Sequence, residues 1–462
     1  MLGINVWFQW LLLAAGVGLS VIFQRSFAII PYQRLATFSL GLAALALWWF
    51  LQSDYRLRLY RLPAASLIAA LSGVWLIQGM AVNEITPYVV TDAYFVLGAL
   101  LVTLIARSMW MIYVRSGKIG PQDCRLPNSL FIVIAIVIST GKWTGVSLGP
   151  EFPFLLLSNL GVLSILRQAR PWHFITGLGS CVFFAINGNR GFLLASLAAM
   201  ALIVTCALVR IRLAKKGMVA LLMIAAPIGF FFLLDFADSR EADSALARRL
   251  DEINTAATVI SGGGTVEDIP IAMYQRVYEA EQVADSLTGS NNPLIPIFGY
   301  GFGALISMEG SSDESVTSSA QLGASRVHNI HFLPFMIGYR FGLVGLLLLS
   351  YFLIKVGKTI LDYLSSRTDL MPEPYRSVSA YRFGCLIFVV SSIIYSLPAS
   401  ATIFNSTLLF VAIGILSYSG MSASGGGHRM APLRDDTRNF QPSRHRMHEI
   451  RPAQQESHRE PS

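Results

Sequence analysis

The stretch LPFMIGYRFGLVGLLLLSYFLIK, residues 333–355, decides the fold class. Arg340 is its single charged residue before the final Lys355, and crossing the hydrocarbon core of a bilayer takes about 20 apolar residues. Similar segments recur along a chain of 462 residues that is 54% hydrophobic and only 13% charged. Because soluble domains carry about 25% charged residues, the sequence predicts an all-α polytopic membrane protein.

About twelve apolar segments are candidate transmembrane helices, and a large, partly helical periplasmic loop precedes the tenth of them. The first segment lacks a basic region and a cleavage site, so we expect it to be retained as a span. The resulting organisation places helices 1–9 in residues 1–235, the loop in 236–327, helices 10–12 in 328–420 and a disordered cytoplasmic tail in 421–462. The candidate spans are residues 4–23, 34–51, 63–82, 87–106, 128–146, 150–166, 171–187, 190–210, 217–235, 333–355, 380–397 and 400–419.

The net charge of +8 does not indicate nucleic-acid binding, because the basic residues gather in alternate short loops between the spans. That bias follows the positive-inside rule and predicts cytoplasmic termini. The cysteines show neither a disulfide pattern nor metal-ligand spacing. No metal or other cofactor is therefore expected. The cysteines are Cys124, Cys181, Cys206 and Cys385.

Two histidines, His328 and His331, stand in RVHNIHF at the outer end of the tenth span, flanked by Arg326 and Asn329. Histidine can accept and return a proton near neutral pH, which suits a general base. The alternative is a pair of interfacial side chains with one wet and one apolar end. The pairing favours a functional role.

Arg340 follows within the same segment. In one straight helix it would lie about 18 Å below His328, at about 1.5 Å per residue, which is costly in a bilayer. A bend permitted by Pro334 and Gly338 would instead leave residues 328–336 flat and Arg340 near the interface, which we expect.

Two other arginines are candidates for binding an anion. Arg190 would begin the eighth span, where a helix end offers free N–H groups, although a snorkelling interfacial arginine is the alternative. Arg276 lies in a predicted loop helix over 268–287, where a surface ion pair with Glu279 at i, i+3 is the alternative. The glycines that follow in PIFGYGFG predict a tight backbone bend rather than a dinucleotide site. They are Gly299, Gly301 and Gly303.

Taken in order, these features resemble the O-antigen ligase and polysaccharide polymerase superfamily of membrane glycosyltransferases, over about residues 130–415. Counting by the family's glycine pair would make His331 the catalytic histidine, whereas the His-Asn dipeptide gives His328, which we choose. The matching motifs are Arg190-Gly191, Arg276 followed by PIFGYGFG, His328-Asn329, and FGLVG with Gly342 and Gly345.

The resemblance implies transfer of a glycan from undecaprenyl diphosphate to an acceptor hydroxyl at the periplasmic face, with inversion and without a metal. The histidine would activate the hydroxyl, and Arg190 and Arg276, with Arg340 or Arg326 in reserve, would stabilise the leaving diphosphate. A chain-length regulator and a flippase are the implied protein partners.

The acceptor separates a polymerase from a ligase. Residues 236–326 are rich in acids and contain no lysine, which disfavours the anionic lipid A core that a ligase must bind and favours a polymerase. A transporter of the same lipid-linked glycan would need charged residues along several spans. A scaffold without catalytic activity is the other alternative.

Overall fold

The computed structural model describes residues 63–83, 87–115, 119–144, 151–186, 190–210, 271–308, 326–328, 330–365, 372–373, 375–398, 400 and 406–417. Within these ranges every regular element is a helix, and one isolated antiparallel bridge joins Ile306 to Val327. The spans expected at 4–23, 34–51 and 217–235 and the tail lie outside the described residues.

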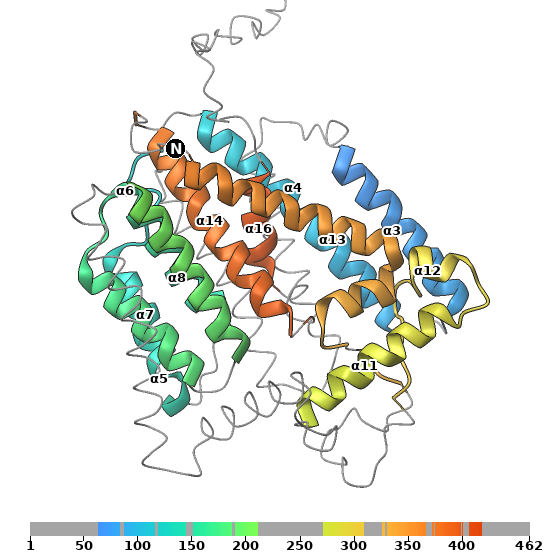
Figure 1. Cartoon of the computed structure of the whole chain (residues 1–462). Coiled ribbons are helices and arrows are strands. Elements are labelled where there is room, and N and C mark those ends of the chain that lie inside the picture. The colour runs from blue at the N-terminus through green and yellow to red at the C-terminus, as the bar shows by residue number, and fades with distance from the viewer. Residues whose placement is uncertain are drawn as a thin grey trace, which may run out of the picture. The chain divides into compact units, whose positions relative to one another are not determined.

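Figure 1 shows the helices as one packed group in which α14 contacts α6, α8, α13 and α16. The expected loop helix is confirmed as α11, and the short α12 follows it. The helices are α3 (Pro63–Val82), α4 (Pro87–Arg115), α5 (Asn128–Thr144), α6 (Glu151–Leu166), α7 (Pro171–Ile186), α8 (Arg190–Arg210), α11 (Ile271–Thr288), α12 (Leu294–Phe298), α13 (Leu333–Ser365), α14 (Tyr375–Ser396) and α16 (Thr407–Leu416).

Two of the described helices, α13 and α14, are long and apolar enough to cross a membrane. Shorter apolar helices accompany them, with bounds Leu67–Val82, Phe95–Met111, Asn128–Ile138, Glu151–Leu166 and Leu194–Cys206. A mostly helical fold with membrane-length helices is therefore confirmed, and the full count of spans stays a prediction.

Several helix ends gather at one end of the group. The rings of Phe154 in α6 and Phe192 in α8 stack at 5.2 Å, and Tyr395 in α14 lies 5.7 Å and 6.5 Å from them. The N–H of Leu333 donates to the carbonyl of Leu397 at 3.0 Å. The first turns of α6, α8 and α13 therefore lie beside the end of α14.

The glycine-rich segment that follows α12, residues 299–303, crosses this same end of the group. The N–H of Gly301 donates to the carbonyl of Arg340 at 2.9 Å, and that of Phe302 donates to the carbonyl of Trp75 at 3.1 Å. Asn83, at the end of α3, donates to the carbonyl of Tyr300 at 2.8 Å. The segment thus joins α3 to α13 through backbone hydrogen bonds, as the predicted bend requires.

Substituting Gly301 should test this close approach. Its φ of 77° favours glycine, and a Cβ would overlap with the backbone of Gly79 and Trp75. We expect Gly301→Ala to destabilise the protein by about 2–5 kcal/mol, measured as a lower midpoint of thermal unfolding in detergent. Gly73→Ala on α3 is the control, because a Cβ there meets no atom within 4 Å; an unchanged midpoint for Gly301→Ala would contradict the packing.

Candidate functional site

Glu279 on α11 and His331, just before α13, form a hydrogen-bonded pair that we call the histidine–carboxylate site. Nδ1 of His331 lies 2.7 Å from Oε1 of Glu279, and the backbone N–H of His331 donates to Oε2 at 2.8 Å. The Glu279 side chain is 1% exposed, whereas that of His331 is 34% exposed. One buried carboxylate therefore binds both the ring and the backbone N–H of a histidine whose side chain is accessible to a substrate.

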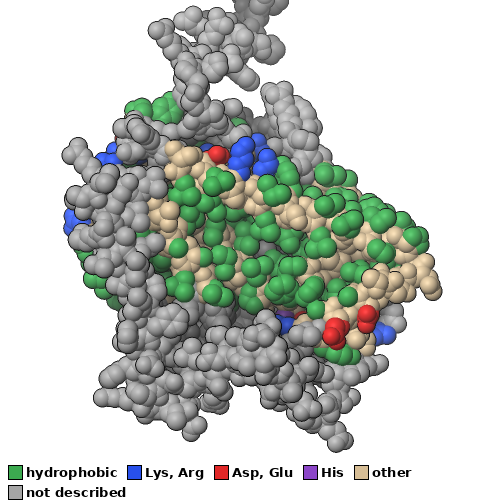
Figure 2. Space-filling model, viewed as in Figure 1, with side chains coloured by type: hydrophobic (Ala, Val, Ile, Leu, Met, Phe, Trp, Pro, Cys, Tyr) green, Lys and Arg blue, Asp and Glu red, His purple; other side chains and the backbone are tan. Residues whose placement is uncertain are grey.

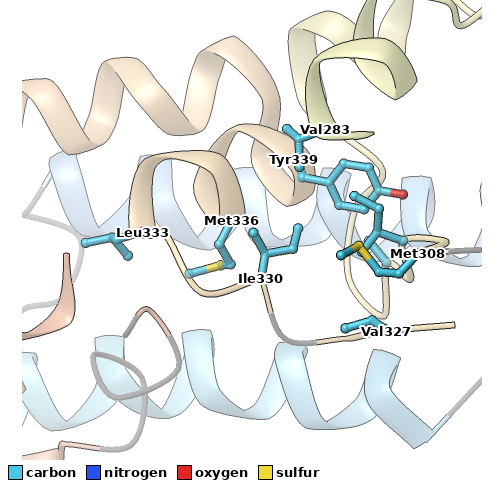
Figure 3. Close-up of a cluster of buried hydrophobic side chains, with 9 residues drawn as sticks. Val283, Met308, Val327, Ile330, Leu333, Met336 and Tyr339 are labelled. Carbon is cyan, nitrogen blue, oxygen red and sulfur yellow. The ribbon is translucent and has the colours of Figure 1, made fainter. Parts of the chain in front are cut away.

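The surroundings hold this pair in place. Gln275, one helical turn before Glu279, donates to Oε1 at 3.0 Å, and the N–H of Ser400 donates to the carbonyl of His331 at 2.8 Å. A hydrophobic cluster joins α11, the glycine-rich segment and the first turns of α13 (Figure 3). It comprises Val283, Ala304, Ile306, Met308, Val327, Ile330, Leu333, Met336 and Tyr339.

The pair has the arrangement of a general base with its orienting carboxylate. When Nδ1 donates its proton to Glu279, the lone pair of the neutral ring is on Nε2. Nε2 of His331 makes no hydrogen bond to any residue that the structure describes. A carboxylate in this position fixes the tautomer and stabilises the imidazolium that forms after proton transfer. His331 is thus equipped to accept a proton at Nε2.

Arg276 lies on the same helix, three residues before Glu279, so the two side chains share a face. The alternative considered for Arg276, an ion pair with Glu279, is not found among the described residues, because the carboxylate of Glu279 bonds to His331 and Gln275 instead. Nε of Arg276 is buried without a hydrogen-bond partner there. A bound anion would give this buried nitrogen the acceptor that it lacks.

A second group of charges is more fully buried, and we call it the buried ion cluster. It consists of Asp92 on α4, His328 in the segment before α13, and Arg340 on α13. Oδ1 of Asp92 lies 3.1 Å from an Arg340 nitrogen and 3.2 Å from Nε2 of His328. Oδ2 accepts the N–H of Gly303 at 2.8 Å, and Arg340 also donates to the carbonyl of His328 at 2.6 Å. These contacts tie α4 and α13 to the glycine-rich segment.

His328 is fully engaged within this cluster. Nε2 faces the Asp92 carboxylate, Nδ1 lies 3.2 Å from the carbonyl of Ala304, and Tyr88 stacks on the ring at 4.2 Å. Both ring nitrogens therefore face oxygen acceptors. The side chain is 12% exposed. These contacts suit a structural role better than that of a base.

The break in the helix that carries Arg340 lies at a different residue from the one expected. The chain does not bend at Pro334 or Gly338; the helical conformation of α13 is broken at Gly342, where φ is 61°. The backbone of α12 approaches at this break, so that a Cβ on Gly342 would overlap with Ile297 and Gly299. Arg340 is buried, at 6% exposure, and Asp92 supplies its counter-charge. Its expected place near a membrane interface stays a prediction.

The remaining candidate residues are placed as follows. Gly299, Gly301 and Gly303 all have positive φ and support the buried ion cluster. Arg326 is exposed and precedes the bridge at Val327. Arg190 begins α8 as predicted, although its side chain is not described, and Asn329 lies outside the described residues. Among described residues, no three His, Cys, Asp or Glu side chains are grouped to hold a metal ion.

Sequence reasoning missed Asp92 and the role of Glu279. The signal for Asp92 was present, because an acid within an apolar segment is by default a candidate for a functional or paired site. Glu279 gave no such signal, since its partner is more than fifty positions along the chain.

No family model matches the chain, and no curated protein matches it significantly.

Proposed function

We propose that the chain is an inverting, membrane-embedded glycosyltransferase that transfers or polymerises glycan repeat units linked to undecaprenyl diphosphate. The observation that supports this most is the Glu279–His331 pair, whose Nε2 is free among the described residues, beside the unpartnered Nε of Arg276. A base next to a cation is what attack by a hydroxyl and departure of a diphosphate require.

A bilayer location is supported by the outer surface. Large apolar side chains are exposed on several helices, including Ile77, Ile175, Ile354 and Leu361 at 65–73% exposure. Figure 2 shows hydrophobic side chains across one face, with charged side chains gathered at its margins. Exposed apolar area of this extent is typical of contact with lipid or protein. Twelve spans in a bacterial inner membrane are part of this proposal.

The gathering of helix ends also supports the proposed topology. The ends of α3 and α14 and the starts of α4, α6, α8 and α13 all contact one another or the glycine-rich segment. If the spans cross the membrane in alternating directions and the N-terminus is cytoplasmic, each of these helix ends lies on the periplasmic side. The histidine–carboxylate site lies at that same end, where the donor's diphosphate would be.

The proposed mechanism gives His331 the role of base, in place of His328. The acceptor hydroxyl transfers its proton to Nε2 as its oxygen attacks the anomeric carbon, and the bond to the diphosphate breaks. Glu279 stabilises the imidazolium, and Arg276, with Arg190 at the start of α8, stabilises the charge on the leaving diphosphate. The family's glycine spacing also points to His331.

A polymerase remains the favoured activity, with ligation to the lipid A core as the alternative. Deleting the gene distinguishes them through the lipid-linked glycans that accumulate. Loss of a polymerase leaves single repeat units, either capped onto the surface or on undecaprenyl diphosphate. Long polymer stranded on undecaprenyl diphosphate would show a ligase instead, and unchanged surface glycan would contradict both.

The topology can be tested at two exposed, described positions. Thr288 ends α11 and Ser365 ends α13, and the four native cysteines are buried. Thr288→Cys should react with a membrane-impermeant thiol reagent in intact cells whose outer membrane is permeabilised, whereas Ser365→Cys should react only after lysis. Labelling of Ser365→Cys before lysis would overturn the proposed orientation.

A further inference from the structure

A cavity of about 350 Å³ lies where the chain passes from α6 to α7 and enters α5. Its volume is at the lower end of the range for ligand pockets, about 300–1,000 Å³. It is at the far end of α6 from Phe154, so it is separate from the histidine–carboxylate site. Its lining residues are Arg125, Asn128, Arg167, Gln168, Ala169, Arg170 and His173.

The cavity is strongly basic. Three arginines line it, and none of its lining residues is acidic. Asp123, the acid nearest to Arg125 in sequence, accepts the N–H of Gly120 at 3.0 Å in a turn. Helices α5 and α7 begin at Asn128 and Pro171, and helix N-termini add positive potential and free N–H groups. The arginines and these helix ends together give the cavity a positive potential, which attracts anions.

Buried polar contacts hold this arrangement in shape. His173 is only 3% exposed, and its Nδ1 accepts the N–H of Arg170 at 3.1 Å. Trp172 stacks on the His173 ring at 3.7 Å. Arg125 donates to Gln168 at 3.0 Å, which links the segment before α5 to the segment after α6. The guanidinium groups are thus attached to a preorganised backbone.

The backbone at Arg167 adds a second indication. Arg167 ends α6 with a φ of 58°, and it is the one residue other than glycine with positive φ in the described part of the chain. Helices commonly end in this left-handed conformation with glycine, which adopts it freely. An arginine at such a position is retained at a conformational cost, which a role for its side chain would explain.

We infer that this cavity binds a phosphoryl group, presented either by an anionic phospholipid headgroup or by a soluble phosphate. Arginine suits this ligand because its planar guanidinium donates two parallel hydrogen bonds to phosphate oxygens. In the proposed orientation the cavity opens to the cytoplasmic side, where both sources are present. The site is independent of glycan transfer.

Calorimetric titration of the full chain in a neutral detergent tests this inference. The probes are dioctanoyl phosphatidylglycerol, inorganic phosphate and, for comparison, zwitterionic dioctanoyl phosphatidylcholine. Arg170→Gln and Arg167→Gly should each weaken binding of the anionic probe about tenfold or more, the scale of a lost charged hydrogen bond. Arg376→Gln is the matched control, because Arg376 is an arginine outside the cavity that pairs with Glu373.

The outcomes separate the two sources. Binding of phosphatidylglycerol alone identifies a lipid headgroup, and binding of inorganic phosphate with equal loss in the variants identifies a soluble ligand. Glycine adopts the positive φ at position 167 freely, so Arg167→Gly should fold. This variant can therefore test the inference even if Arg170→Gln does not fold. Equal affinity in all variants, equal loss in Arg376→Gln, or binding of neither anionic probe overturns the inference.

Discussion

Replacing His331 by alanine is expected to lower glycan transfer by about 10²–10⁴-fold, the contribution of a positioned general base. The reason is that Nε2 is the atom we propose to take the hydroxyl proton, while Nδ1 is committed to Glu279 at 2.7 Å. The measurement is the rate of lipid-linked glycan consumption by equal amounts of folded protein. The midpoint of thermal unfolding should fall only modestly, because the buried Glu279 keeps its hydrogen bonds to the backbone N–H at position 331 and to Gln275.

Two matched variants sharpen this expectation. Glu279→Gln should also lower the rate strongly, for two reasons. The amide can donate to Nδ1, which places the ring proton on Nε2, where it blocks the base. The substitution also removes the charge that stabilises the imidazolium. His328→Gln should instead lower the yield and thermal stability, with activity per folded molecule largely retained. A folded but inactive His328→Gln, together with an active His331→Ala, would return the role of base to His328.

Replacing Asp92 by leucine is expected to have the largest effect on stability, about 3–5 kcal/mol. Among the described residues, Asp92 is the single acid that contacts both Arg340 and His328, and its side chain is 6% exposed. Without it, a buried guanidinium lies opposite an apolar side chain. The midpoint of thermal unfolding in detergent should fall markedly, whereas Asp285→Leu, which removes an exposed acid on α11, should leave it unchanged.

A double-mutant cycle separates the charge pair from mere packing. Arg340→Met removes the cation that Asp92 neutralises, so Asp92→Leu combined with Arg340→Met should be more stable than Asp92→Leu alone. The coupling between contacting residues is typically 0.5–3 kcal/mol. Additive losses in the double variant would mean that the ion pair does not hold α4 against α13.

Local patterns predicted the helices well because they depend on neighbouring residues. The loop helix expected at 268–287 is found at Ile271–Thr288, and the span expected at 380–397 is found at Tyr375–Ser396. The glycine-rich bend was predicted for the same reason, since alternating glycines permit the positive φ that Gly299, Gly301 and Gly303 adopt.

The partners within the site depend on tertiary contacts, and sequence reasoning missed them. The acid that pairs with Arg340 lies on α4, far away in the sequence, and was not foreseen. The break in α13 was expected at Pro334 and Gly338; it lies at Gly342 because the backbone of α12 approaches there. Both features were missed because the span from 333 was treated as an isolated helix.

The most direct test of the central claim is turnover by the purified chain. Lipid-linked glycan extracted from the deletion strain would be added to the protein in proteoliposomes with EDTA, and released undecaprenyl diphosphate would be measured by mass spectrometry. The account predicts release coupled to longer glycan for the unaltered chain and almost none for His331→Ala. Absence of release from the folded, unaltered chain with donor and acceptor present, or equal release from His331→Ala, would contradict it.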